Sequence, residues 1–276
     1  MNGNNPTLLR AIRGPIMMIT VGVLFALDHM TEFTFGRTWP AILIVLLFGL
    51  AIGFINGLTV VKTRLPSFIV TLATFFVLQG VNAAGTLKLT GTTAIQNIDT
   101  AGGFDSARRL FASDITHWGF KVKVLWWIGL TLVGAWLLAK SRFGNWIYSV
   151  GGEPNAARNV GVPVARTKIT LFMMTSGVAA LMGIIEALEL RSMQAKEGIG
   201  LEFIFIICAV VGGCLLTGVF GSVIGTFFGA AMLGMVQLGI VDAQWDSNWT
   251  YTFQGAILFA AVLLNTAIRA RMRRAR

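Results

Sequence analysis

The chain has 276 residues, of which 55% are hydrophobic and only 12% are charged. A soluble domain of this length carries roughly twice that share of charged residues, so the composition excludes an ordinary soluble protein and indicates a membrane protein. The net charge of +10 does not predict nucleic-acid binding, because no basic face interleaved with aromatic residues is present.

Hydrophobic segments recur along the whole chain, and most approach the length of about 20 residues that a helix needs to cross a bilayer. In chain order they are residues 12–27, 39–61, 67–84, 124–139, 169–188, 203–219, 222–240 and 252–268. The sixth and seventh meet at Phe220 and Gly221 without a charge between them. The sequence therefore predicts an all-α polytopic membrane bundle in one domain, residues 1–276, with about eight spans or seven plus a re-entrant hairpin.

The basic residues are distributed unequally between the two sides of this bundle. With the N-terminus inside, the inner segments hold 14 of the 22 basic residues but only one of the 12 acidic residues, Glu153. This asymmetry satisfies the positive-inside rule. Both termini and residues 140–168 are thus predicted to be cytoplasmic, residues 85–123 are predicted to form a long outer loop, and the chain is expected to lie in a membrane, in contact with lipid.

The inner segment 140–168 is the most ordered polar stretch of the sequence. Gly151, Gly152 and Pro154 predict a turn, and the residues from Asn155 to Arg158 are a good start for a short helix. A short helix on the membrane surface is where a cytoplasmic partner is expected to dock.

Polar side chains inside apolar spans are costly unless they face another helix or an aqueous path. Ser67 and Thr74 are predicted to join helices through hydrogen bonds. The candidates for a substrate path are Asn56, Thr71, Gln79 and Asn82.

Three charged residues close the fifth hydrophobic segment. Glu186 and Glu189 share a helix face, and Arg191 follows. We expect an ion network with Arg191 at the membrane boundary. A proton relay would require a second buried ionisable group, and the neighbouring segments offer none, so energy for transport is expected from outside the chain.

The seventh hydrophobic segment carries glycines at a spacing of four, Gly221, Gly225 and Gly229. Residues four apart share a helix face, and glycines there allow another backbone to approach closely. These three are predicted to serve helix packing.

The sequence contains no combination of residues that predicts catalysis. His29 and His117 lie in predicted outer loops without metal-ligand spacing, and Cys208 and Cys214 lie in one apolar run as packing residues. A GxxxxGK[ST] phosphate loop is missing, so the chain is not expected to hydrolyse ATP. Neither a metal nor a cofactor is predicted.

Three blocks, in this order, are similar to one family. They run from Gly53 through Asn56-Gly57 and Leu65-Pro66-Ser67 to Thr74, from Tyr148 through Gly151-Gly152 and Asn155-Ala156-Ala157-Arg158 to Gly161 and Lys168, and from Gly212-Gly213 through Gly221-Ser222 and Gly225-Thr226 to Gly229-Ala230. With the segments between them they cover the chain from about residue 40. The chain resembles the membrane permeases of ABC-type sugar importers, in the ribose, xylose and autoinducer-2 branch.

The resemblance implies a multi-pass transport subunit of a bacterial inner membrane and not an enzyme. Such a permease works as a homodimer or with a similar subunit, moves its solute by alternating access between the two copies, and binds two ATPase subunits and an extracytoplasmic solute-binding protein. The element that receives motion from the ATPase would be formed by Gly151, Gly152, Asn155, Ala156, Ala157, Arg158 and Gly161. Arg158 would be its exposed anchor, able to bind acidic groups.

The sequence departs from the family in three places. An N-terminal block that the family carries is missing near residues 11–14, a doubled glycine is replaced by Gly218-Val219, and Gln254 stands where the family often has lysine. Gln254 is therefore added to the candidates for the substrate path.

The leading interpretation is a monosaccharide permease, for a sugar such as ribose or xylose. A branched-chain amino-acid or nucleoside permease, and a truncated membrane subunit without transport activity, stay open as alternatives. A secondary transporter would need inverted repeats and buried ion ligands, which we do not find, and an intramembrane enzyme would need a reactive cluster.

Overall fold

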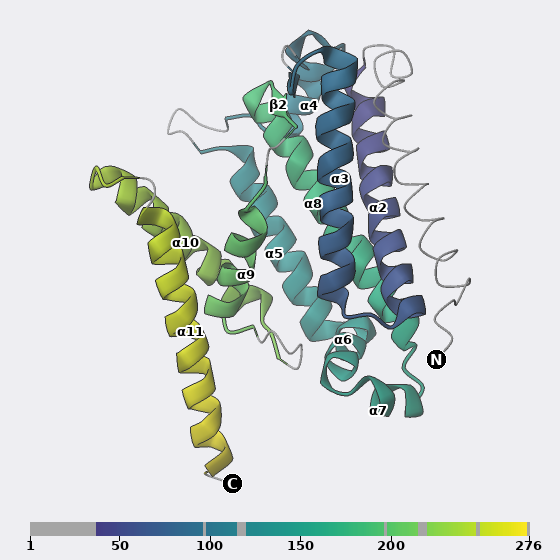
Figure 1. The fold of residues 1–276 in the computed structure, drawn as a ribbon, viewed down its shortest axis with the longest axis vertical. Helices are drawn as coiled ribbons and strands as arrows, with labels where there is room; N and C mark the ends of the chain where they lie inside the picture. The colour runs from purple at the N-terminus through teal and green to yellow at the C-terminus, as the bar shows by residue number, and fades with distance from the viewer. Residues whose placement is uncertain are drawn as a thin grey trace, which may run out of the picture. The chain divides into compact units, whose positions relative to one another are not determined.

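The computed structural model describes residues 37–95, 98–114, 120–195, 198–214, 220–246 and 249–274 (Figure 1). Its helices are α2 (Thr38–Thr63), α3 (Ser67–Thr90), α4 (Phe104–Phe111), α5 (Val122–Lys140), α6 (Arg142–Gly152), α7 (Pro154–Asn159), α8 (Val164–Leu190), α9 (Leu201–Val211), α10 (Val223–Asp242) and α11 (Trp249–Arg274). The fold is that of a polytopic helical membrane protein. Two compact units compose it: unit 1 is Met1–Trp126 with Ala165–Glu197, and unit 2 is Trp127–Val164 with Gly198–Arg276.

Five of the described helices are long and apolar enough to cross a membrane: α2, α3, α5, α8 and α10. The first predicted span, residues 12–27, lies outside the described residues. The sixth, predicted over 203–219, is shorter than expected, because α9 has 11 residues and ends at Val211. At 1.5 Å per residue it is about 16 Å long, roughly half of the hydrocarbon core. Within α11, the apolar stretch is Trp249–Leu263.

The predicted outer loop 85–123 contains more regular structure than expected. Helix α3 continues to Thr90, and strand β1 (Ala94–Ile95) then pairs antiparallel with β2 (Met193–Gln194), which follows α8. The 3-10 helix η1 (Ile98–Thr100) and helix α4 come next. The loop thus connects the C-terminal ends of α3 and α8 through backbone hydrogen bonds.

The core of unit 1 joins α4 to two spans. Helix α4 buries Phe104, Ala107 and Phe111 against Ile42 of α2 and Ile185 of α8. Its other face carries Asp105, Arg108 and Arg109, so the amphipathic pattern alone determines which side packs. Trp126, in the first turns of α5, stacks on Phe111 with ring centroids 5.4 Å apart.

Helices α2 and α8 cross at glycines. A Cβ atom at Gly53 would lie 2.5 Å from the backbone oxygen of Phe172, and one at Gly57 would lie 2.8 Å from the Cα of Ile169. One at Gly49 would lie 2.6 Å from the Cβ of Ala180. Three glycines spaced by four thus bring the two backbones together, as in other small-residue contacts between membrane helices.

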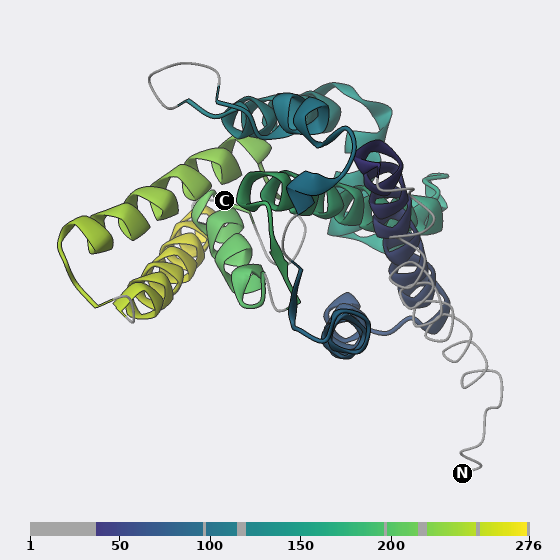
Figure 2. The same cartoon turned by 90° about the horizontal axis from the view of Figure 1, so that it is seen from above.

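Unit 2 is built around α9, α10 and α11. Ile207 and Cys208 of α9 pack on Leu233 of α10, with Ile257 and Leu258 of α11 beside them. Helices α10 and α11 form a hairpin, seen from above in Figure 2. Trp127 of α5 stacks on Phe227 of α10 with centroids 4.1 Å apart.

Candidate functional site: the coupling segment and the polar residues of the spans

The predicted cytoplasmic segment 140–168 is largely helical, because each of its helices has a defined start. The Ser141 hydroxyl accepts a hydrogen bond from the amide of Gly144 at 3.0 Å and caps α6. A Cβ atom at Gly144 would lie 2.6 Å from the carbonyl oxygen of Leu137, so only glycine fits this corner after α5. The carboxylate of Glu153 caps α7 at the amide of Asn155, and Pro154 occupies the first helical turn. The predicted short helix is confirmed as α7.

Helix α7 ends in a Schellman turn. The amide of Gly161 donates to the carbonyl of Arg158 at 3.0 Å, and the amide of Val162 donates to that of Ala157 at 3.0 Å. Gly161 has φ of +84°, the left-handed conformation that this turn requires and that favours glycine. Gly161 therefore has a structural reason to be glycine that is independent of any partner.

A small apolar core holds α6 and α7 together. It consists of Val150, Ala157 and Val164, with Val162 packed on it. Ala157 is only 4% exposed, so among the seven predicted coupling residues it faces this core and not a partner. Gly151 is half-buried, whereas the other five are exposed: Gly152, Asn155, Ala156, Arg158 and Gly161.

Helix α6 also contacts the turn before α10. The phenol of Tyr148 donates a hydrogen bond to the backbone oxygen of Gly221 at 2.8 Å. This contact was missed by sequence reasoning, since nothing in the spacing of residues 73 positions apart indicates it. It links α6 to the turn that leads into α10.

The glycines of α10 lie against α9 and the chain that follows it. A Cβ atom at Gly225 would collide with the backbone oxygen of Gly212, and one at Gly229 with that of Cys208. One at Gly221 would lie 3.2 Å from the Sγ of Cys214. Cys214 in turn has its Sγ 3.3 Å from the hydroxyl of Thr226.

The four candidate path residues of unit 1 form no hydrogen bond with one another in the described part of the chain. Asn56 is 8% exposed and accepts a hydrogen bond from the Thr74 hydroxyl at 2.7 Å, which joins α2 to α3. Asn82 donates to the backbone oxygen of Ala195 at 2.9 Å. Thr71 donates to its own helix at Ser67, and Gln79 is half-buried.

Gln254, the fifth candidate, lies on α11 in unit 2, whereas the other four lie in unit 1. It is 5% exposed. Asn56 and Gln254 are thus the two candidates that the described structure buries.

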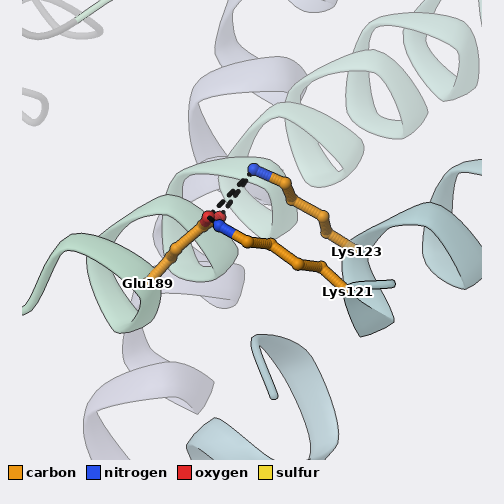
Figure 3. A network of polar contacts seen from close by, with 3 residues as sticks. All are labelled: Lys121, Lys123 and Glu189. Carbon is orange, nitrogen blue, oxygen red and sulfur yellow. Dashed lines mark hydrogen bonds and ion pairs between the residues drawn. The ribbon is translucent and has the colours of Figure 1, made fainter. Parts of the chain in front are cut away.

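The predicted ion network exists, but with other partners. Glu189 of α8 receives both lysines that flank the start of α5: Lys121 at 2.5 Å, and Lys123 at 2.8 Å (Figure 3). Arg191 instead approaches Asp99 of η1, at 3.8 Å. The expectation that Arg191 would bind the glutamates is wrong, because α5 places two lysines nearer to Glu189. The hydrogen bond and charge of Glu189 raise the pKa of Lys121 above its usual value of 10.5.

The family described as branched-chain amino acid transport system / permease component matches residues 14–262, which is most of the chain and includes all three blocks noted in the sequence. The chain belongs to this family. Similar proteins include, from Escherichia coli K12, an inner membrane ABC transporter permease, YjfF, at 31% identity over 82% of this chain and 66% of the relative.

Two further relatives of this permease, also from Escherichia coli K12, have names that state a solute. The ribose import permease RbsC is 33% identical over 82% of this chain and 68% of its own length. The galactose/methyl galactoside import permease MglC is 32% identical over 94% of this chain and 77% of its own length. The chain thus spans about two thirds to three quarters of these relatives, and no solved structure matches it.

Family membership and the five span-length helices make the permease a multi-pass protein of the inner membrane. The relatives are sugar permeases with several different solutes, and their alignments do not single out one of these solutes for this chain. No group of three or more His, Cys, Asp or Glu side chains that could hold a metal occurs among the described residues.

Proposed function

We propose that the permease is the membrane subunit of an ATP-driven importer for a small polar solute, a monosaccharide such as ribose or xylose. The observation that carries the proposal is the α6–α7 segment: a surface element with capped helices, its own apolar core and an exposed arginine. Sugar import permeases among the relatives supply the solute class.

The partners follow from this proposal. A separate ATPase subunit docks on α6–α7 and supplies the energy, and an extracytoplasmic binding protein delivers the solute. A second permease, identical or similar, completes the path. The hydrogen bond from Tyr148 to Gly221 offers a route by which a displacement of α6 reaches α10.

Within the path we propose roles of two kinds. Asn56, Thr71, Gln79, Asn82 and Gln254 present polar groups to the solute in one state of the cycle. The Oδ1 of Asn56 already accepts from Thr74, so its Nδ2 group is the donor that we assign to the solute. Gly221, Gly225 and Gly229 keep α10 close to α9 and its following chain.

One alternative solute is supported by a specific observation, the family description itself, which names branched-chain amino acids. Uptake of radiolabelled ribose, xylose and leucine, each with competing unlabelled solute, distinguishes the two. Uptake of leucine without sugar uptake would overturn the monosaccharide assignment.

The test of the ATPase assignment is copurification. The tagged permease is co-expressed with a candidate ABC ATPase subunit, and solute-stimulated ATP hydrolysis is measured on the purified complex. Arg158→Glu, at an exposed site with no described intramolecular partner to lose, should abolish stimulated hydrolysis while membrane insertion stays intact. Full stimulation in this variant would remove α6–α7 from the coupling role.

A further inference from the structure

Val160 is the most exposed large apolar residue in the described part of the chain, with 79% of its surface accessible. The other strongly exposed apolar side chains lie mostly on span-length helices, where lipid covers them. Val160 instead follows α7 on the predicted cytoplasmic side, in water. Among the large apolar side chains of residues 141–163, only Trp146 is also exposed, at 36%.

An isolated apolar residue on a surface is by itself unremarkable, but the backbone around Val160 is unusually well defined. Its amide donates to the carbonyl of Ala156, and the two Schellman hydrogen bonds to Arg158 and Ala157 span it. Val162 then turns back into the small core with Val150 and Val164. The segment therefore buries two valines, packs a third on them and holds the fourth outward on a defined turn.

The charges around Val160 indicate what kind of surface it faces. Arg158 is exposed two positions before Val160, and Glu153 is the sole acid of residues 140–168. Docking surfaces commonly combine an apolar centre that is buried on binding with a charged rim. Such a surface is complementary to an apolar pocket bordered by carboxylates.

We infer that Val160 inserts into an apolar pocket of the ATPase subunit, with Arg158 binding a carboxylate at the rim of that pocket. This inference rests on the proposed function. The valine provides most of the apolar contact of the α7 tip, and the Schellman turn at Gly161 keeps it in a binding-ready position, so little conformational freedom is lost on docking.

Insertion of Val160 into the lipid headgroups is the competing arrangement. One valine beside Asn159 and Arg158 offers little apolar area to a bilayer, whereas membrane-surface helices use a whole apolar face. We therefore favour the protein pocket, and the experiment below separates the two.

The first test uses the ATPase subunit that copurifies with the wild-type permease. It measures how tightly each permease variant binds this subunit. Val160→Thr keeps the shape of the side chain but replaces one methyl group by a hydroxyl. This variant should weaken binding by about tenfold, because a polar atom enters an apolar pocket. Val160→Ile keeps the apolar character and should bind within about threefold of wild type. Elution of each variant as a single species verifies folding.

The second test follows accessibility. In a C208A/C214A background, Val160→Cys is labelled with a water-soluble maleimide in vesicles whose cytoplasmic face is outward. Labelling should be rapid without the ATPase subunit and at least tenfold slower with it. Asn159→Cys, the adjacent exposed position, serves as the matched control and should be protected less.

The outcomes are distinguishable. If Val160→Thr binds like wild type while Arg158→Glu does not, docking is polar, so the inference falls and the proposed function stands. Resistance of Val160→Cys to labelling without the ATPase would mean that lipid covers the site, which also overturns the inference. Failure of the wild-type permease to retain any ABC ATPase would overturn both.

Discussion

At the residue scale, Gly161 shows how one backbone conformation supports a surface. Its φ of +84° is strained for any residue with a Cβ atom. Open space surrounds the position, so a substitution there tests the backbone without a steric clash.

Gly161→Ala should therefore reorganise the end of α7 at a cost of about 1 kcal/mol, and ATP hydrolysis should be coupled less tightly to solute. Amide hydrogen exchange of residues 157–164 measures the change. Gly152→Ala is the control, since it also has open space around it but no positive φ. Equal exchange in both variants would contradict the role of the turn.

Asn56 and Thr74 form the buried polar pair of unit 1, through one hydrogen bond of 2.7 Å. Such bonds between membrane helices contribute about 1 kcal/mol. Thr74 is predicted to join helices and Asn56 to line the path. Because they share one hydrogen bond, a substitution of either residue affects both roles.

Thr74→Val should lower the free energy of unfolding by about 1 kcal/mol, measured by reversible unfolding in mixed micelles. Thr74→Val removes the hydroxyl that donates to the Oδ1 of Asn56, so solute uptake by this variant separates the two roles of Asn56. The apparent affinity for solute should stay unchanged if Asn56 only joins helices. If the amide also binds solute, that affinity changes. An unfolding free energy equal to that of wild type would contradict the contribution of the bond.

Lys121 supplies the pH prediction. Glu189 raises its pKa above 10.5, so the charged form is favoured in the folded protein. The stabilisation is fully present below the unfolded-state pKa and is lost as pH rises through the higher folded-state value. The difference in unfolding midpoint between wild type and Lys121→Met should thus be constant from pH 7 to about 9.5 and shrink above about 10.5. A difference that grows at alkaline pH would contradict this assignment.

At the element scale, glycines allow close helix packing in both units, on α2 in unit 1 and on α10 in unit 2. In unit 1 the glycines of α2 admit the backbone of α8, and in unit 2 those of α10 admit α9 and Gly212. The spacing of four predicts packing for Gly221, Gly225 and Gly229, and the same spacing at Gly49, Gly53 and Gly57 was the signal that could have predicted the contact of α2 with α8.

Gly53→Val should force α2 and α8 apart, because even a Cβ atom would lie 2.5 Å from the Phe172 backbone oxygen. We expect a loss of about 1–3 kcal/mol or more, seen as a lower unfolding midpoint in detergent. Gly80→Val on α3 is the matched control, since nothing lies within 4 Å of its added Cβ. Similar losses in both variants would indicate an effect of helix propensity and not of packing.

The polar ends of the helices were less predictable than their apolar middles. Hydropathy located α2, α5 and α10 to within a few residues. It placed the end of α3 at residue 84, whereas the helix continues to Thr90. Capping glycines and local hydrogen bonds, not hydropathy, determine such ends.

At the scale of the whole molecule, the proposal requires an external energy source. Glu189 is bound by two lysines at the C-terminal end of α8, so it forms a structural ion pair and is a poor candidate for proton transfer. Transport energy is therefore assigned to the ATPase subunit.

In proteoliposomes that contain the permease, its ATPase subunit and its binding protein, uptake should depend on enclosed or added ATP. A protonophore should change the initial uptake rate by less than about twofold, because no proton gradient is used. Loss of uptake on adding the protonophore at constant ATP would support a secondary transporter instead.

The amino-acid sequence by itself determined the helical membrane class and the family, and it predicts the sidedness. These depend on local properties of the sequence: the length of each apolar segment, the basic residues beside the spans, and short motifs that occur in the order found in the family. The start of α7 was likewise determined by local sequence, since Pro154 and the Asn155–Arg158 stretch favour the start of a helix.

Only the tertiary structure decided which of these residues contact one another. It paired Glu189 with Lys121 and Lys123 and left Arg191 to Asp99. It turned Ala157 inward and Val160 outward, and it linked Tyr148 to Gly221. Such contacts join residues far apart in the chain or select one face of a short helix, and they depend on how the surrounding elements pack, which no local pattern encodes.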